Sequence, residues 1–366
     1  MNPSESALPL PEPRFDERRL AAAFAVLGDL VAGGRVPAAI VGVAGPAGEA
    51  RLASFGAGTA GEPITPAHRF SIASVTKPIV ATVVMQAIED GLLSLDRRIV
   101  ECVPSFTPPS PLAGGAEEIT IGQLLNHTSG IVDLPQRPDR QHSAADIIGE
   151  LSLQPLVFPP GSAFAYASDS FFLLAEVIRV ADGVEAFEES LHRRLLGPLQ
   201  MGATSFRGRE PGRPSAPVGM IGVSEPELTV LGRWFEALQH PGGGLWSTAG
   251  DLVRFGQAML NGGSLDGTRI LSPTTVALMT SDQTVGLLDV GDPSFRPSYG
   301  FGWDKSAASR DLPGSPAQFD HAGSSGSRLW VDPARGLVVV MVAGLWRTGG
   351  ELFDEVIVPV YEAMLA

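Results

Sequence analysis

Strand-forming segments lie near both ends of this 366-residue chain, and a long part with helical patterns separates them. Near the start, residues 38–44 and 49–56 are apolar stretches split by Gly-Pro-Ala-Gly, which is typical of a β-hairpin. Near the end, residues 328–331 and 336–343 repeat the pattern around a turn at residues 332–335. A sheet must bury its apolar face against another element. We therefore expect the two ends of the chain to build one antiparallel sheet that helices cover.

The prediction is an α+β fold, in which an antiparallel sheet flanked by helices carries an inserted, mostly helical lobe. Residues 16–73 and 263–366 would form the sheet lobe, and residues 74–262 the helical lobe. The Pro-rich and polar residues 1–15 would be a flexible lead-in, and a last helix is expected over residues 351–364. Because ligands favour the groove between two lobes, we expect a functional site there.

Residues that cap helices precede several segments of the middle part. A Ser or Thr hydroxyl at this position accepts a hydrogen bond from an N–H group that the first helical turn leaves unpaired. These helix starts are predicted at Thr120, Ser143 and Thr248, before residues 121–127, 144–151 and 249–260.

The net charge of the chain is −14, and no Arg-rich run occurs. A strongly acidic chain is poorly suited to bind nucleic acid or an anionic membrane, so we expect neither as a partner. The single cysteine, Cys102, excludes an intrachain disulfide, and no Cys/His cluster has metal-ligand spacing. We therefore expect no metal and no cofactor. No apolar run reaches the ~18 residues needed to span a bilayer.

Arg18 and Arg19 precede an apolar segment, residues 20–27, which resembles an export signal. Asp29 interrupts this segment, and its apolar side chains fall on one helical stripe. We interpret the segment as a surface helix and expect a cytoplasmic protein. The oligomeric state is left open.

Lysine is scarce in this chain: of 26 lysines and arginines only two are lysine, Lys77 and Lys305. Lys77 follows Ser74 by three residues. An arginine cannot lose its proton in a protein, whereas a desolvated lysine can. A general base that activates a serine nucleophile must accept a proton, so this spacing indicates nucleophilic catalysis. The alternative is a solvated lysine at the start of a helix.

The surroundings of Ser74 favour the catalytic interpretation. Residues 75–90 have the periodicity of one helix, which Gly91 ends. Pro78 is tolerated only in the first turn because it lacks an N–H group, so the helix must begin close to Ser74. The Ser74 N–H then has no partner within the helix and lies at the positive end of the helix dipole. A hydroxyl, an amine and a free N–H would meet there, which suits acyl transfer.

Two further segments combine small residues with one functional side chain. Tyr166 lies among small residues before a helix over residues 171–181, which Ser168 or Asp169 would cap. Its alternative role is packing in the core. His321 begins a run of small residues that leads into a strand, where a ligand can approach the backbone closely. The alternative there is a Gly-rich loop with a surface histidine.

Three motifs, in this order, resemble those of the serine β-lactamase-like hydrolases: Ser74-x-x-Lys77, Tyr166-Ala167-Ser168 and His321-Ala322-Gly323. Within that group, which has the penicillin-binding-protein fold, the chain is most similar to class C β-lactamases, family VIII carboxylesterases and D-aminopeptidase-type enzymes. The resemblance extends to residues 124–130, 243–249 and 299–303 and covers nearly the whole chain. It implies a β-lactamase/transpeptidase-like fold.

The resemblance also implies catalytic roles for individual residues. Ser74 would be the acylated nucleophile, and Lys77 its base. Tyr166 would assist Lys77 and pass the proton to the leaving group. The backbone N–H groups of Ser74 and Ser324 would form the oxyanion hole. A free lysine has a pKa of about 10.4, so Lys77 must be desolvated to act at neutral pH.

Three residues would bind the substrate: Ser168, His321 and Gly323. Two of them depart from the lactamase pattern. The second motif usually ends in Asn, where this chain has the shorter Ser168, and the third usually begins with Lys, where it has His321. A histidine is mostly neutral at pH 7. Both departures weaken binding of an anionic β-lactam and leave ester hydrolysis intact.

We therefore predict a cofactor-free serine hydrolase, similar to carboxylesterases, that cleaves small esters through an acyl-enzyme on Ser74. One alternative is an amide hydrolase of the same family, such as a β-lactamase, a D-aminopeptidase or a D,D-peptidase. Another is a non-catalytic ligand sensor with this fold, which the intact Ser-Lys-Tyr set disfavours. No Gly-x-Ser-x-Gly elbow occurs, which argues against an α/β-hydrolase. The motifs do not specify the natural acyl group or leaving group.

Overall fold

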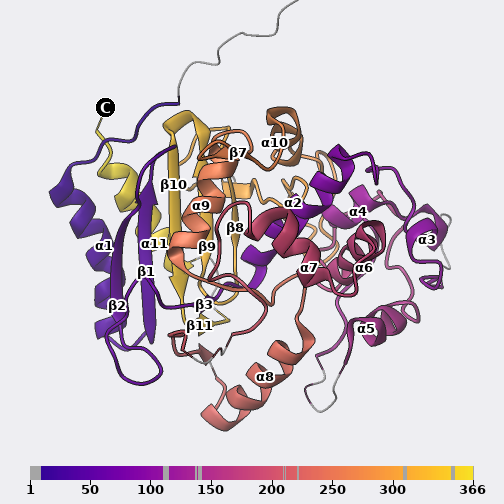
Figure 1. Cartoon of the computed structure of the whole chain (residues 1–366), viewed down its shortest axis with the longest axis horizontal. Helices are drawn as coiled ribbons and strands as arrows, with labels where there is room; N and C mark the ends of the chain where they lie inside the picture. The colour runs from indigo at the N-terminus through magenta and orange to yellow at the C-terminus, as the bar shows by residue number, and fades with distance from the viewer. Residues whose placement is uncertain are drawn as a thin grey trace, which may run out of the picture.

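The computed structural model describes residues 10–109, 115–136, 138, 142–208, 210, 212–220, 222–307, 311–347 and 351–365. Its centre is a five-stranded antiparallel sheet with the strand order β2-β1-β10-β9-β8 (Figure 1). The strands are β1 (Ala38–Ala44), β2 (Arg51–Gly56), β8 (Phe319–Ala322), β9 (Arg328–Asp332) and β10 (Leu337–Ala343).

The two ends of the chain meet in the middle of this sheet. Strand β1 pairs antiparallel with β10, so that Ala39 lies opposite Ala343 and Val43 opposite Val339. Every residue of β1 and β10 is buried, because both faces of the sheet are covered. The prediction of one antiparallel sheet built from both ends is therefore confirmed.

Successive residues of the central strands face two different hydrophobic cores, as the two-residue period of a strand requires. Val339 and Met341 belong to the core under helices α1 (Glu17–Ala32) and α11 (Glu351–Glu362). Val338 and Val340 belong to the core shared with the helical middle of the chain. Figure 1 shows α1 and α11 on one side of the sheet and the middle helices on the other.

Helix α1 confirms the surface helix expected near the N-terminus. Its apolar stripe, which includes Leu20 and Leu27, is buried against the outer face of the sheet. The Asp16 side chain caps its first turn by accepting bonds from two backbone N–H groups. Among the described residues, none of the helices combines the length and the apolar character needed to cross a membrane.

Helix α9 (Ala249–Leu260) packs on the inner face of the sheet, against β1, β9 and β10. Gly256 makes this approach possible, because a Cβ atom there would lie 2.7 Å from the Val338 side chain. The sequence division assigned residues 249–260 to the helical lobe, whereas the helix covers the sheet. The division into lobes at residues 74 and 262 stays a prediction.

The middle of the chain is helical, as expected. Its helices are α2 (Thr76–Glu89), α3 (Ile99–Cys102), α4 (Ile121–Leu125), α5 (Ala144–Leu151), α6 (Ser170–Asp182), α7 (Phe187–Leu191) and α8 (Glu225–Leu238), with α10 (Pro273–Met279) after α9. The caps Thr120, Ser143 and Thr248 are confirmed. Helix α4 is shorter than predicted, because His127 has a positive φ of 61° and cannot continue the helix.

Candidate active site

Ser74 lies in a short 3₁₀ turn, η1 (Ala73–Val75), between strand β3 (Phe70–Ser71) and helix α2. The preceding Ala73 has φ 44°, a left-handed conformation that residues other than glycine rarely adopt. Such strain persists only where the surrounding structure imposes it. Here the Ile72 N–H donates to the Leu245 carbonyl at 3.0 Å, and the Leu245 N–H donates to Thr76 Oγ1 at 3.2 Å. The sequence did not indicate this strain.

Lys77 is completely buried one helical turn beyond Ser74. Its Nζ donates hydrogen bonds to Ser74 Oγ at 3.1 Å, Ser168 Oγ at 3.0 Å and the Gly242 carbonyl at 2.7 Å. A neutral amine keeps two N–H groups, enough for Ser168 and Gly242, and its lone pair can then accept the Ser74 proton. The solvated lysine considered from the sequence is therefore wrong.

The environment of Lys77 makes the neutral amine accessible near pH 7. Burial disfavours the charged form and lowers the pKa of Lys77 to about 7. The carboxylates of Asp133 and Asp169 oppose this shift. A base with a pKa close to the working pH combines a large neutral fraction with useful basicity.

Tyr166 lies beside the lysine, with Lys77 Nζ 4.6 Å from the centre of the Tyr166 ring. The residue is 41% exposed, so the ring is open to solvent on one side. Burial at the site nevertheless raises the pKa of Tyr166, and a hydrogen bond with the Ser74 side chain only partly opposes this shift. The phenol therefore keeps its proton at neutral pH, and Lys77 is the stronger candidate for the base.

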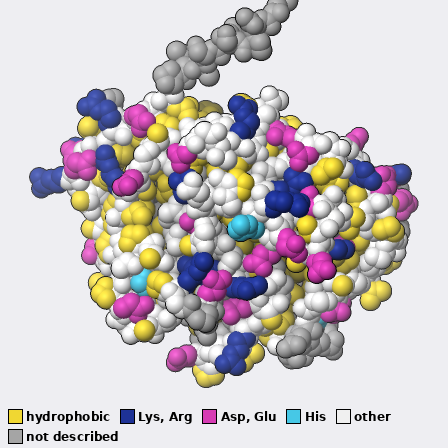
Figure 2. Space-filling view, in the orientation of Figure 1, with side chains coloured by type: hydrophobic (Ala, Val, Ile, Leu, Met, Phe, Trp, Pro, Cys, Tyr) yellow, Lys and Arg dark blue, Asp and Glu magenta, His cyan; other side chains and the backbone are white. Residues whose placement is uncertain are grey.

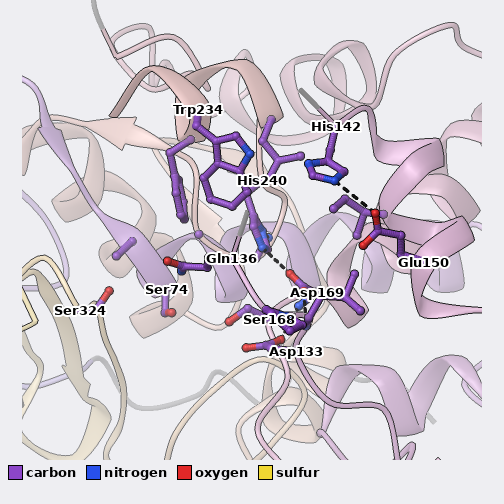
Figure 3. Close-up of a pocket in the computed structure, with 18 of the residues that line it drawn as sticks. Ser74, Asp133, Gln136, His142, Glu150, Ser168, Asp169, Trp234, His240 and Ser324 are labelled. Carbon is purple, nitrogen blue, oxygen red and sulfur yellow. Dashed lines mark hydrogen bonds and ion pairs between the residues drawn. The ribbon is translucent and has the colours of Figure 1, made fainter. Parts of the chain in front are cut away.

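Two backbone N–H groups are free at this site. Within the described part of the chain, neither the Ser74 N–H nor the Ser324 N–H donates to a protein acceptor. Gly323 lets the end of strand β8 approach the turn before Ser74, because a Cβ atom there would lie 2.4 Å from the Ile72 carbonyl oxygen. Ser74 and Ser324 line the same cavity and lie at the same end of it (Figure 3). This arrangement suits an oxyanion hole.

His321 is buried behind the site, and both its ring nitrogens have protein partners. Nδ1 lies 2.9 Å from the Ala322 carbonyl, which can only accept, so Nε2 accepts from the Tyr299 hydroxyl at 2.9 Å. Burial and the nearby positive charge of Lys77 lower the pKa of His321 to about 3. The histidine is thus neutral, as the sequence suggested. Substrate binding by His321 and Gly323 stays a prediction.

A chain of polar contacts that the sequence did not indicate holds the Gly242 carbonyl on Lys77. His240 Nε2 donates to Asp169 Oδ1 at 2.9 Å, and His240 Nδ1 accepts from the Gly242 N–H at 3.0 Å. Asp169 occupies the N-cap position of α6, but its side chain binds His240 and the Leu134 N–H instead of capping the helix. Ser168 binds Lys77, so neither residue is the side-chain cap that we expected. The only sequence feature that pointed to this segment is the Pro-Gly-Gly-Gly run at residues 241–244. That run indicates a turn, and it does not indicate the contact with Lys77.

His127 holds the backbone on both sides of Tyr166. The His127 carbonyl accepts from the Ala165 N–H at 3.0 Å, and Nδ1 accepts from the Ala167 N–H at 3.2 Å. The two rings of His127 and Tyr166 lie 4.4 Å apart, centre to centre. Burial lowers the pKa of His127, so its ring is neutral and Nδ1 remains an acceptor. His127 is therefore a positioning residue for Tyr166.

We expect His127→Leu to lower any turnover that depends on Tyr166 about tenfold, since it removes one hydrogen bond and the support of Tyr166. His127→Asn should stay within about threefold of the wild type, because Asn supplies an acceptor and tolerates a positive φ. Steady-state kinetics with thermal melting as the fold control would measure this. Equal losses in both variants would contradict the positioning role.

The sheet flanked by helices, together with the buried Ser-Lys pair, defines a serine hydrolase with the penicillin-binding-protein fold. The Beta-lactamase family model matches residues 23–354, so the chain belongs to the Beta-lactamase family. The resemblance drawn from the three motifs is confirmed at the level of the family. The roles of the individual site residues stay predictions.

Relatives within this family carry different names. Penicillin-binding protein 4 of Amycolatopsis lactamdurans is 31% identical over 293 residues, 77% of this chain and 74% of that protein. Esterase EstB of Burkholderia gladioli is 30% identical over 331 residues, 77% of this chain and 79% of that protein. The solved structure of EstCE1, a hydrolase with promiscuous acyltransferase activity, superposes with a TM-score of 0.79 over 94% of this chain and 99% of that chain. At 20% identity, the last likeness shows the fold alone.

Proposed function

We propose that this protein is a carboxylesterase that hydrolyses small esters through an acyl-enzyme on Ser74. The observation that carries the proposal is the buried Lys77 amine, which is bonded to Ser74 Oγ and has its pKa lowered to about 7. A serine hydroxyl is a weak nucleophile until a neighbouring base accepts its proton. A cytoplasmic location is part of this proposal, since residues 17–32 form a helix integral to the fold.

The proposed reaction begins when neutral Lys77, directly or through the Tyr166 hydroxyl, accepts the proton of Ser74 Oγ. The oxygen attacks the ester carbonyl carbon, and the N–H groups of Ser74 and Ser324 stabilise the negative oxygen that forms. The carbon–oxygen bond to the alcohol then breaks, and Tyr166 donates a proton to the departing alkoxide. Protonated Lys77 returns its proton to Tyr166, so that both groups regain their starting forms. Water hydrolyses the acyl-enzyme by the same steps in reverse and frees Ser74.

Charge at the site favours esters over anionic β-lactams. None of the described residues that line the cavity beside Ser74 is a lysine or arginine, whereas three are Asp or Glu. The neutral, buried His321 offers no cation to a substrate carboxylate. An amide hydrolase of the same family is the second candidate, because one relative at 31% identity is named a penicillin-binding protein.

A fluorophosphonate probe and a substrate panel would test the proposal. We expect one covalent adduct by intact-protein mass spectrometry, absent in Ser74→Ala. We also expect kcat/KM for butanoate esters to exceed that for nitrocefin by about tenfold or more, because no charge-assisted hydrogen bond holds the lactam carboxylate. An adduct that persists in Ser74→Ala would refute the nucleophile. Nitrocefin turnover equal to the best ester would favour the amide hydrolase.

A further inference from the structure

We propose that the cavity beside Ser74 binds a cationic group, such as an alkylammonium, on the acyl part of the substrate. This inference rests on the proposed hydrolysis at Ser74 and names the class of substrate. The cavity has a volume of about 150 Å³, small beside the roughly 300 Å³ at which typical ligand pockets begin. It therefore suits a slender acyl chain better than a bulky acyl group.

The cavity runs away from the nucleophile. Figure 3 shows Ser74 and Ser324 at one end, and His142 and Glu150 at the other, with Trp234 and His240 between them. Helix α8 contributes Trp234, and helix α5 contributes Glu150. Helices α5 and α8, which line the far end and the middle of the cavity, thus take no part in the chemistry at Ser74.

Two of the three lining carboxylates have an oxygen available to a ligand. Asp169 uses both its oxygens on His240 and the Leu134 N–H. Asp133 accepts from the Asp169 N–H through Oδ1 only, and Glu150 contacts His142 through Oε1 only. Among the described residues, Asp133 Oδ2 and Glu150 Oε2 have no hydrogen-bond partner. The described lining contains no lysine or arginine, so its Asp and Glu side chains favour a positively charged group.

His142 supplies an independent sign of a ligand. Its side chain is only 6% exposed, and Nε2 lies 3.2 Å from Glu150 Oε1, so Nε2 carries a proton and Nδ1 of the neutral ring is an acceptor. Nδ1 is buried and has no partner among the described residues. A buried acceptor without a donor is unfavourable. An ammonium N–H group that reaches Nδ1 from the cavity would satisfy it.

The remaining wall is aromatic. Trp234, Phe235 and Trp346 all line the cavity, and the rings of Phe235 and Trp346 meet edge to face at 5.3 Å. Aromatic faces attract desolvated cations and also pack against an alkyl chain. Acidic oxygens, one histidine acceptor and aromatic faces together match an alkylammonium group better than an anionic one. Trp234 Nε1, a buried donor with no partner among the described residues, is neutral.

The position of the cavity assigns this group to the acyl side. Tyr166, which donates the proton to the leaving alcohol in the proposed reaction, does not line the cavity, and neither does its neighbour His321. The leaving group must lie near Tyr166. The acyl group, which stays on Ser74, is the part of the substrate left to enter the cavity.

Phenyl esters with matched acyl groups would test the proposal. One set is 3-aminopropanoate, butanoate and the succinate half-ester, and the longer set is 6-aminohexanoate, heptanoate and the pimelate half-ester. Within a set, the acyl groups have similar size and differ in charge. We expect kcat/KM of the cationic ester to exceed that of the neutral one by about tenfold in at least one set. This ratio should be smaller at high salt, because salt screens the attraction between the charges. The anionic ester should be the poorest.

Glu150→Gln should lower the ratio of cationic to neutral kcat/KM about fivefold or more and leave the neutral ester within about twofold. The matched control is Asp29→Asn, an exposed charge change on α1, which should leave the ratio unchanged. For Asp133→Asn only the ratio of cationic to neutral kcat/KM is compared with the wild type, because Asp133 also acts on Lys77 and can change both rates. A wild-type ratio near one, or one that Glu150→Gln does not alter, would overturn the proposal.

A binding measurement separates this inference from the proposed function. In Ser74→Ala, calorimetry should detect 6-aminohexanamide but not heptanamide, and Glu150→Gln should abolish that binding. If no ester is hydrolysed and no adduct forms, the proposed function fails while this binding result still supports the cation site. Equal affinity for both amides would refute the site even if esters are hydrolysed.

Discussion

Lys77→Arg should lower kcat/KM for esters by about 10²-fold or more, nearly as much as Lys77→Met. The arginine keeps a positive charge next to Ser74 Oγ but cannot accept its proton. The methionine keeps the length of the side chain and removes the base entirely. If Lys77 were only an electrostatic partner, the arginine variant would retain much of the activity. Stopped-flow or steady-state kinetics on one ester would compare the two variants.

The pH profile of the wild-type enzyme gives a second measure of the same role. Only the neutral amine can accept the proton, so kcat/KM should rise with pH through about 7, where burial places the pKa of Lys77. Activity is lost as pH falls below that value because the amine becomes protonated.

Thermal melting of Lys77→Arg and Lys77→Met controls for folding, since a guanidinium at a fully buried position is costly. An arginine variant with more than about a tenth of wild-type activity would exclude Lys77 as the base.

Tyr166→Phe should lower turnover of alkyl esters by about 10²-fold and leave the fold intact. The substitution removes one hydroxyl and keeps the ring that packs against His127. Because the phenol holds its proton at neutral pH, it can donate that proton to an alkoxide leaving group. The loss should be smaller for p-nitrophenyl esters, whose leaving group departs without a proton. The slope of log kcat/KM against leaving-group pKa measures this difference.

Tyr299→Phe is the matched control for Tyr166→Phe. Its hydroxyl bonds Nε2 of His321, a predicted substrate-binding residue, and has no part in proton transfer, so any loss of activity should not depend on the leaving group. If Tyr166→Phe lowered kcat/KM equally for all leaving groups, Tyr166 would not be the acid that protonates the leaving alcohol. Its role would then be limited to the activation of Ser74. If Tyr166 had only a packing role in the core, Tyr166→Phe would lower the free energy of unfolding by the ~0.5–1.5 kcal/mol of a lost hydrogen bond. The melting temperature would then fall, and turnover would stay almost unchanged.

Much of the fold follows from local patterns in the sequence. The two hairpins, helix α1 and the caps of α4, α5 and α9 depend on turn residues, capping hydroxyls and apolar periodicity within a few residues, so they could be predicted. The Ser74–Lys77 pair is also local, because a three-residue spacing on one helical turn brings the two side chains together. Residues 110–114, which precede α4, lie outside the described part of the chain.

Features that depend on distant residues could not be predicted in this way. The placement of α9 on the sheet depends on the space that Gly256 leaves beside Val338. The strained Ala73 is held by Leu245, and the cavity joins residues of α5 and α8 to Ser74. None of these contacts leaves a signal in the spacing of neighbouring residues.

The sequence by itself determined which residues are the candidates for the chemistry, because the Ser-x-x-Lys spacing and Pro78 place a hydroxyl, an amine and a free N–H at one helix start. Only the tertiary structure decided that the amine can act as a base. An isolated helix would leave Lys77 in water with its ordinary pKa. Folding buries it completely and brings two partners to it, Ser168 and the Gly242 carbonyl. These partners lie 91 and 165 positions further along the chain. Desolvation of the charged form is a property of that packing, and it is what brings the pKa of Lys77 to about 7.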